Sequence, residues 1–410
     1  MRNAYAPGPP VTPASVRIRI GFAAVALHTC IGAVYAGSVL VQPLQQAFGW
    51  SRPEITLAFS IAIALLGLSA AASGAAIARR GARWASMWAL VFVVLGYLGS
   101  ACAIYLGSKL GLYLCYGVVT GIGLGLGYIA PLGVLIRAFP HHRGMATGLA
   151  VTGFGLGPMV FGPVMGWLFS SIGLVSGFLV LAMLYASVIG AAAWAFGPHA
   201  LVVPVSSAAS RCLAFTRSGQ FWCMWLMLCI NISCGVALVS VAAPLLQELG
   251  QVSIETAAAL VGLAGLFNAA GRIFWANFSD KVGRPRVWVG LFFLGQLSFA
   301  AMTQTSDSYW FQTFFMLAIT CFGGGFACMP PYVADLFGSE RVPHVYGWMM
   351  TALSAAGFIG PTIITQIHDA TGSYYLSLPV FVCMLAFGCI LSMLLGRHVV
   401  ARHAQPATAK

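Results

Sequence analysis

The sequence predicts an all-α membrane protein in which twelve helices cross the bilayer as two bundles of six. Three observations predict this class: the composition, the distribution of Lys and Arg, and an internal repeat. Of the 410 residues, 60% are hydrophobic and only 7% are charged, whereas a soluble domain carries about 25% charged residues. Apolar runs long enough to cross a hydrocarbon core of about 30 Å as helices follow one another along almost the whole chain. The short alternating segments typical of a transmembrane β-barrel do not occur in the sequence.

The apolar runs, read from one loop signal to the next, define the expected helices in order. The N-terminal stretch contains Arg2, Arg17 and Arg19 but no cleavage pattern of small residues. We therefore expect no removable signal peptide and keep the first run as a membrane helix. The expected spans are 18–43, 54–78, 84–106, 109–137, 144–168, 173–196, 219–247, 255–279, 287–305, 309–337, 344–367 and 374–396.

Lys and Arg fall almost entirely on one side of this arrangement. That side holds seventeen of them, and the other side holds two, Arg52 and Lys109. Because positive residues near the ends of spans are retained in the cytoplasm, we expect both termini to be cytoplasmic and the protein to lie in the plasma membrane, which in a bacterium is the inner membrane. Basic loops that face an anionic leaflet account for the net charge of +12. No nucleic-acid partner is expected.

The two halves of the chain repeat one another. Segments 140–158 and 343–361 align without gaps and share Pro, His, Gly and a final Gly-Pro, and the basic loops at 74–83 and 276–285 align at nearly the same separation. Because many transporters consist of duplicated halves, we expect two parallel six-helix bundles. The expected domains are a cytoplasmic tail at 1–17, a first bundle at 18–196, a cytoplasmic linker at 197–218, a second bundle at 219–396 and a cytoplasmic tail at 397–410.

Glycine and proline cluster within the spans, most clearly in the paired motifs Gly157-Pro158 and Gly360-Pro361. A proline inside a helix removes one backbone hydrogen bond, and glycine lets two helices in lipid approach closely. These four residues are candidates for helix flexing. Tight packing without motion is the alternative interpretation of each glycine.

Arg272 is a charged residue in the middle of an apolar run. A charge at mid-membrane costs roughly 2.5–3.5 kcal/mol on insertion scales, and none of the eight Asp and Glu residues falls at the middle of a span. A guanidinium group without a protein carboxylate matches a carboxylate ligand in shape and charge, so we interpret Arg272 as the binding residue for an anionic substrate. Two alternatives stay open: the side chain extends toward the nearby cytoplasmic face, or backbone carbonyls and water satisfy it.

Four other polar residues within spans are candidates for the same site. Asn268 lies one helical turn before Arg272 and shares its face. Tyr35 and Tyr128 are midspan residues whose hydroxyls could contact a carboxylate or simply pack. His28 is the only histidine well inside a span, so it could titrate and couple proton movement, or it could hydrogen-bond to a neighbouring helix.

The two basic loops and the repeated six-span halves resemble the major facilitator superfamily. Its signature loop reads Gly-x-x-x-Asp-Arg/Lys-x-Gly-x-Arg. The second copy in this chain has Ala276 at the first glycine, and the first copy has Ala78 at the acid. The resemblance implies a cytoplasmic latch between helices, complete in the second half and incomplete in the first. The residues that match are Asp280, Lys281, Gly283, Arg284 and Arg286 in the second copy and Gly74, Arg79, Gly81 and Arg83 in the first.

The chain is also similar to the oxalate/formate antiporter family, a relative of the monocarboxylate porters. The similarity lies in "FNAAGRIFW", "AFPHHRG", "GFGLGP" and "YGWMMTALSAAGFIGP". It implies that Arg272 binds a substrate carboxylate and that Tyr35 and Tyr128 line the cavity. Oxalate carriers have a lysine in span 11 within Thr-Ala-Lys, where this chain has Leu353. One cation neutralises a monoanion, so a monocarboxylate is expected, and Phe322, Phe326 and Trp348 would suit an apolar tail.

The favoured hypothesis is a secondary transporter of small organic anions that works by alternating access, either as a proton symporter or as an anion exchanger. The alternatives are a dicarboxylate exchanger of the oxalate/formate type and an exporter of hydrophobic organic compounds. An enzyme is not expected because no catalytic cluster occurs in the spans. The eleven cysteines lack metal-ligand spacing, so we expect packing roles for them and neither a metal nor a cofactor. We expect a monomer.

Overall fold

A computed structural model describes residues 13–197, 213–305 and 307–404, and these residues are helical apart from short connections. The first half contains α1 (Ala14–Gly32), η1 (Ala33–Leu40), α2 (Val41–Phe48), α3 (Arg52–Tyr105), α4 (Lys109–Leu112), η2 (Tyr113–Val119), α5 (Thr120–Ala138), α6 (Arg143–Ile172) and α7 (Leu174–Phe196). The second half contains η3 (Leu213–Arg217), α9 (Gly219–Ser240), α10 (Ala242–Glu248), α11 (Ile254–Val282), α12 (Arg284–Gln304), α13 (Ser308–Phe337), η4 (Ser339–Arg341), α14 (Val342–Met349), α15 (Thr351–Thr371) and α16 (Ser377–Ala404).

The membrane-spanning segments match the expected ones. Among the described residues, eleven helical segments are long and apolar enough to cross a membrane. One of them, α3, has 54 residues and contains a break at Gly81. It therefore covers two expected spans, 54–78 and 84–106. The all-helical class with its repeated long apolar segments is confirmed.

Glycine is required at the break in α3. Gly81 has φ 83° and ψ 173°, a conformation that residues with a Cβ rarely adopt. The corresponding residue of the second half, Gly283, has φ 95° and ψ 144° between α11 and α12. A glycine with a positive φ thus lies where the chain reverses between the second and third helix of each half. This conformation explains why both basic loops contain a glycine at this point.

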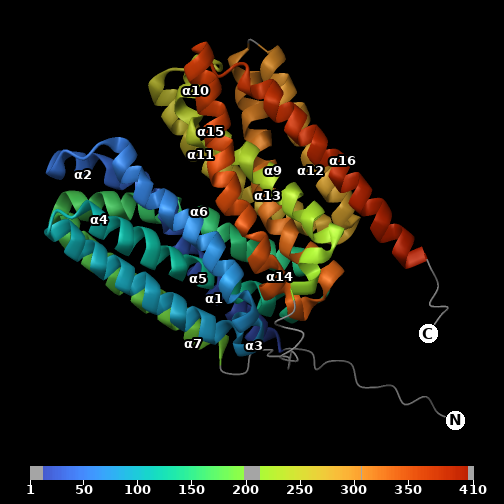
Figure 1. Ribbon diagram of the computed structural model, residues 1–410, viewed down its shortest axis with the longest axis horizontal. Helices are drawn as coiled ribbons and strands as arrows, with labels where there is room; N and C mark the ends of the chain where they lie inside the picture. Colours follow the sequence, from blue (N-terminus) through green and yellow to red (C-terminus); the bar gives the residue numbers. More distant parts are fainter. Residues whose placement is uncertain (1–12, 198–212, 306, 405–410) are drawn as a thin grey trace.

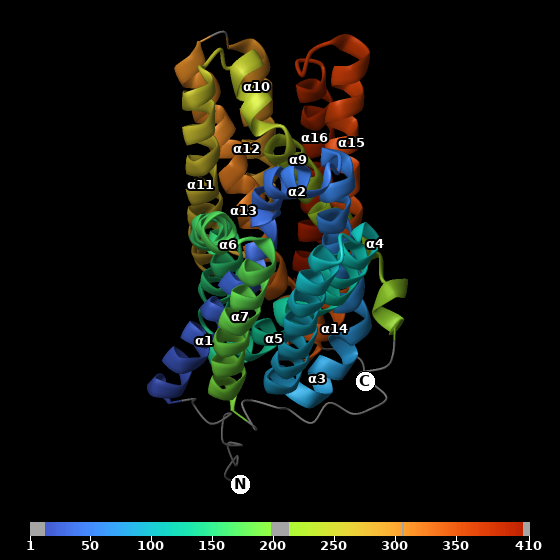
Figure 2. The same cartoon turned by 90° about the vertical axis from the view of Figure 1, so that its left-hand side faces the viewer.

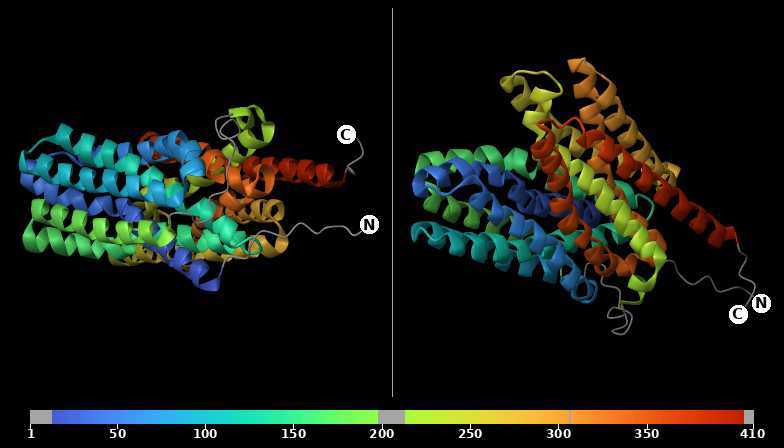
Figure 3. Two further views of the ribbon diagram at one scale, coloured as in Figure 1. Left: turned by 90° about the horizontal axis from the view of Figure 1, so that it is seen from below. Right: turned by 45° about the horizontal axis from the view of Figure 1, so that its top comes forward.

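The two bundles form a V (Figure 1). Its arms end near α2 and α4 in the first half and near α10 in the second half, and the bundles meet close to α14. The view at 90° shows the same arrangement, with α10 and α15 far from α7 and the halves joined at the level of α14 (Figure 2). Two further views agree (Figure 3). We call the joined end the latch end and the other the splayed end.

The glycines of the two Gly-Pro motifs lie directly against neighbouring helices. A Cβ on Gly157 would lie 2.3 Å from the carbonyl carbon of Gly32, and a Cβ on Gly360 would lie 2.1 Å from the carbonyl oxygen of Ser233. Helix α6 continues through Pro158 and helix α15 continues through Pro361. The two glycines thus allow tight packing of helices in this structure, and the role of the four residues in helix flexing stays a prediction.

Helix interruptions occur elsewhere. The first span changes from α1 to the 3₁₀ segment η1, the seventh is broken at Val241, and the eleventh is broken at Met350. At Met350 the backbone N–H is shared between the carbonyls of Tyr346 and Gly347, at 3.0 and 3.1 Å. These breaks place short backbone irregularities inside membrane helices, where neighbouring helices cover them.

Candidate anion-binding site and the latch between the halves

Arg272 lies in the middle of α11 and is buried, with 3% of its surface exposed. Its Nε donates to Oδ1 of Asn268 at 3.0 Å, and its Nη1 donates to the backbone carbonyl of Val151 at 2.6 Å. The guanidinium carbon lies 5.2 Å from the ring centroid of Phe326. Burial on this scale excludes the alternative in which the side chain extends to the membrane surface.

The positive charge of Arg272 is not compensated by an acid. The ion pairs found among the described residues do not include Arg272, and its two hydrogen-bond acceptors, an amide and a backbone carbonyl, are neutral. A guanidinium has five N–H donors, so two hydrogen bonds leave three for other partners. The alternative in which backbone carbonyls satisfy Arg272 thus holds in part, because the carbonyl of Val151 accepts one of its hydrogen bonds. In the described part of the chain, the positive charge of Arg272 has no counter-ion.

The guanidinium packs directly against α6 of the other half. A Cβ on Gly155 would lie 3.3 Å from both Cζ and Nε of Arg272 and 3.4 Å from Oδ1 of Asn268. Thr152 Oγ1 donates to the carbonyl of Ala269 at 3.2 Å, again from α6 to α11. The site therefore lies between the halves, where alternating access requires a substrate site to be.

Aromatic residues of the first half surround the same region. His28 is fully buried, and its Nε2 donates to the carbonyl of Tyr128 at 3.0 Å, which is the helix-to-helix bond that the sequence left as an alternative to proton coupling. The ring of Phe154 lies 5.2 Å from the rings of both Tyr35 and Tyr128, edge to face in each case. Tyr35 also lies 5.9 Å from Phe59.

The predicted residues of the second half do not all contact Arg272. Phe326 does, and Phe322 packs beside it with ring centroids 5.6 Å apart. The carbonyl of Trp348 accepts a hydrogen bond from Thr351, and the backbone N–H of Leu353 donates to Met350. These two contacts lie within the eleventh span. Of the predicted site residues, Asn268 and Phe326 contact Arg272 directly.

Sequence reasoning missed four participants: Val151, Phe154, Gly155 and Tyr346. Tyr346 is fully buried in α14, and its ring lies 6.5 Å from that of Tyr128, nearly parallel at 29°. No signal in the sequence identifies Tyr346, or a backbone carbonyl such as that of Val151, as part of this region, because both positions depend on how the helices pack.

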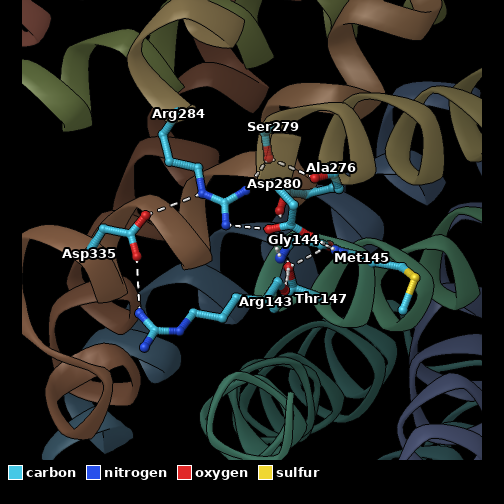
Figure 4. Close-up of polar contacts among 10 residues, drawn as sticks. Arg143, Gly144, Met145, Thr147, Ala276, Ser279, Asp280, Arg284 and Asp335 are labelled. Carbon is cyan, nitrogen blue, oxygen red and sulfur yellow. Dashed lines mark hydrogen bonds and ion pairs between the residues drawn. The ribbon is translucent and has the colours of Figure 1, made fainter. Parts of the chain in front are cut away.

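Asp280 connects the two halves at the latch end (Figure 4). Its carboxylate accepts hydrogen bonds from the backbone N–H groups of Gly144 and Met145, each at 2.9 Å. These two groups belong to the first turn of α6, where unpaired N–H groups and the helix dipole favour a negative charge. An acid of the second half thus caps a helix of the first half.

Further charges extend this contact into a network (Figure 4). Arg284 donates to Asp280 at 2.5 Å, to Asp335 at 3.3 Å and to the hydroxyl of Ser279. Asp335 in turn accepts from Arg143 of the first half at 3.0 Å. The network alternates in sign from Arg143 through Asp335 and Arg284 to Asp280, so every charge in it has an opposite neighbour.

The other residues of the signature loops contribute differently. Lys281 and Arg286 are exposed, and the Nη1 of Arg286 lies 3.5 Å from the carbonyl of Val282. In the first copy, exposed Arg79 bonds to the carbonyl of Ala75 in its own helix, and Arg83 is half-buried.

Gly74 gives the first copy its contact with the other half. A Cβ there would lie 2.3 Å from the carbonyl of Pro343. At the position of the missing acid, Ala78, no carboxylate is available to cap a helix. The latch end is therefore charged on the α6–α11 side and packed backbone to backbone on the α3–α14 side.

Proteins of known sequence resemble this chain over most of its length. The oxalate:formate antiporter of Oxalobacter formigenes is 27% identical over 341 residues, covering 80% of this chain and 79% of that protein. An uncharacterized MFS-type transporter of Escherichia coli (strain K12), YhjX, is 26% identical over 334 residues, 77% of this chain and 80% of that protein. Monocarboxylate transporter 13 of Rattus norvegicus is 26% identical over 307 residues, 72% of this chain and 69% of that protein.

Solved structures and a family model agree on the fold. The human organic anion transporter MFSD10 superimposes with a TM-score of 0.75 at 15% sequence identity, covering 93% of this chain and 100% of that chain. A family model described as Major Facilitator Superfamily matches residues 22–361 and also residues 231–409. With the twelve-span fold and a match that covers well over half of its length, this chain belongs to the Major Facilitator Superfamily of membrane transporters.

Proposed function

We propose that this transporter carries small organic monocarboxylates, and that Arg272 binds the carboxylate of the cargo. One observation carries the proposal: a buried guanidinium lies between the halves and contacts only neutral acceptors in Asn268 and Val151. A buried charge without a partner is costly, and a carboxylate that entered the site would form charge-assisted hydrogen bonds with the free N–H groups. The cargo then supplies the missing negative charge.

The expected charge of the cargo follows from the number of cations. Leu353, with 1% of its surface exposed, stands in the eleventh span where the oxalate carriers are expected to have a lysine. One guanidinium balances one carboxylate, whereas a dicarboxylate would bring a second, unbalanced charge into a low-dielectric site. The aromatic rings of Phe326 and Phe154 beside Arg272 and Tyr128 favour a short apolar tail on the cargo.

The names of the relatives support the same class. One is an oxalate:formate antiporter and another a monocarboxylate transporter, so carboxylates recur among proteins that are about a quarter identical to this chain. Both exchange of anions and symport with a proton agree with the site, because a weak acid can bring its own proton and the described spans place no acid beside Arg272.

We further propose that the latch end faces the cytoplasm. The excess of Lys and Arg on this side of the twelve-span arrangement supports the orientation. The halves meet at this end and diverge at the other (Figure 1), so with this orientation the structure would correspond to an outward-facing state. The network around Asp280 would close the cytoplasmic side in that state, and its disassembly would accompany the change to the inward-facing state.

Uptake of labelled monocarboxylates into proteoliposomes tests the role of Arg272. We expect the Arg272→Gln variant to lose at least about 90% of uptake, because loss of a charge-assisted hydrogen-bonding site is worth roughly 1.5–3 kcal/mol. Arg52→Gln is the matched control, since Arg52 is exposed at the splayed end, and it should transport like the wild type. Normal uptake by Arg272→Gln would refute the assignment of the site.

A further inference from the structure

A histidine lies at the splayed end of the second half, apart from the candidate anion site. His368 is half-buried in the last turn of α15. The helix ends at Gly372, whose backbone N–H donates to the carbonyl of His368 at 2.7 Å. Carbonyl groups at a helix C-terminus attract a positive charge. A protonated imidazole at this position therefore gains an interaction that a neutral imidazole lacks.

A carboxylate from another helix faces this imidazole. Oε2 of Glu248, the last residue of α10, lies 3.8 Å from Nε2 of His368. Oε1 of the same carboxylate accepts hydrogen bonds from the hydroxyl of Ser373 at 2.5 Å and from the backbone N–H of Tyr374 at 3.0 Å. Glu248 therefore joins the end of α10 to the turn between α15 and α16, and its second oxygen is directed at His368.

An acid and an aromatic ring complete the surroundings of His368. Oδ1 of Asp369, the next residue of α15, lies 3.8 Å from Nδ1. The ring of Tyr374 stacks on the imidazole, with centroids 4.2 Å apart and an interplanar angle of 27°. Glu255 and Asp307, at the start of α11 and α13, form no ion pair with His368 within the described residues. A proton on His368 thus adds attraction to two carboxylates and to the face of a tyrosine ring.

Helix α10 is a segment of its own at the splayed end (Figure 1). The seventh span is broken at Val241, where φ is −125° and ψ is 24°, so α10 does not continue the helical hydrogen bonding of α9. A helix interrupted in this way is less stiff at the break than an unbroken one. The contacts of Glu248 at the far end of α10 therefore contribute to its position.

We propose that protonation of His368 strengthens the contact between α10 and the turn after α15, so that the docking of α10 depends on the pH at the splayed end. Imidazole gains and loses its proton between about pH 5 and 8. Because the attractions to Glu248, Asp369 and Tyr374 exist only in the charged form, the contact is strongest at the acidic end of this range and weakens as the pH rises. The inference does not depend on the identity of the cargo.

Amide hydrogen exchange of the purified protein tests this inference. Exchange is followed by mass spectrometry at about pH 5.5 and about pH 8, in peptides that cover Ala242–Glu248 and residues 372–376, and is corrected for the intrinsic effect of pH. We expect protection in the wild type to be at least about threefold greater at the lower pH. His368→Gln, which takes up no proton in this range, should show no such dependence on pH.

A second variant and a control separate the charge from other effects. Glu248→Gln retains an acceptor for Ser373 and Tyr374 but removes the charge, so it should also reduce the dependence on pH. His141→Gln is the matched control, because it removes an exposed histidine at the latch end, and it should respond like the wild type. Protection that is independent of pH in the wild type, or that responds equally in His368→Gln, would overturn the inference. Loss of the response in His141→Gln would overturn it as well.

Discussion

At the scale of single residues, Asn268 and Val151 orient Arg272 in the candidate site without balancing its charge. They accept two hydrogen bonds from Arg272 at 3.0 and 2.6 Å and so fix the orientation of the guanidinium, but as neutral groups they do not balance its charge. Positioning without neutralisation is what a reversible anion site needs. An internal carboxylate would compete with the cargo for the same charge.

The Asn268→Asp variant tests this distinction. A carboxylate in place of the amide would lie beside Nε and neutralise Arg272 from within the chain. We expect uptake of monocarboxylates to fall at least tenfold, while the melting temperature stays at or above that of the wild type. Uptake in proteoliposomes and thermal unfolding of the purified protein measure the two effects.

Asn268→Leu serves as the control for the Asn268→Asp variant, since it removes the hydrogen bond without adding a charge. It should transport better than Asn268→Asp. If Asn268→Asp transports like the wild type, the cargo does not supply the missing charge.

The sequence singled out the buried charge of the candidate site but only part of its surroundings. Arg272 and Asn268 could be found because a charge in an apolar run is rare, and because the two are separated by one helical turn. Val151, Gly155 and Tyr346 could not be found in the same way. Their positions beside Arg272 depend on how α6 and α14 pack against α11 and α5, and a backbone carbonyl or a glycine shows no such function in the sequence.

At the scale of elements, α6 and α11 contact one another both at the candidate site and at the latch end. Asp280 caps the first turn of α6 at 2.9 Å from two backbone N–H groups, and Arg272 binds the carbonyl of Val151 on the same helix. A Cβ on Gly144 would lie 2.2 Å from the carbonyl of Ala276. The two helices are thus connected from the latch end to the centre of the membrane.

The Asp280→Asn variant tests the contribution of the cap. It retains one acceptor but loses the negative charge that favours the helix N-terminus and Arg284, which we expect to weaken closure by about 1–2 kcal/mol. Distances between spin labels placed on the two halves at the latch end should shift toward longer values. Asp369→Asn, at the exposed splayed end, is the control and should keep the wild-type distribution. Identical distributions for Asp280→Asn and the wild type would show that the network does not hold this end closed.

The boundaries of the helices were predictable because loops in this chain carry clear signals. Runs such as 54–78 and 84–106 were separated by a basic loop containing Gly81, and the structure places a break there at a positive φ. The interruptions at Val241 and Met350 were not predicted. The break at Met350 lies against another helix, since a Cβ on Gly67 would come within 2.4 Å of the carbonyl oxygen of Met350. Such a contact is not visible in the local sequence.

At the scale of the whole molecule, the two repeated halves contribute differently to the contact at the latch end. The second copy of the signature loop contributes Asp280 and Arg284 to a charged network, whereas the first copy has Ala78 and contributes close backbone packing through Gly74. The cation count is unequal as well. The candidate site contains Arg272 on the second half, and the residue at 353 is leucine.

The Leu353→Lys variant tests whether the number of cations sets the charge of the cargo. A second positive charge in the eleventh span should raise uptake of a dicarboxylate such as oxalate relative to a monocarboxylate, by roughly tenfold for one added ion pair in a low-dielectric site. Leu353→Met, a neutral side chain of similar length, is the control and should keep the preference for monocarboxylates. An unchanged ratio of oxalate to monocarboxylate uptake in Leu353→Lys would contradict the argument from charge.

Equilibrium binding to the purified protein tests the central claim most directly, because it separates the site from the transport cycle. A ligand that binds only the folded protein raises the melting temperature with concentration. We predict that 2-hydroxypropanoate raises the melting temperature of the wild type in a concentration-dependent manner and leaves that of Arg272→Gln unchanged. The same concentration-dependent rise in Arg272→Gln would contradict the claim that this guanidinium binds the anion.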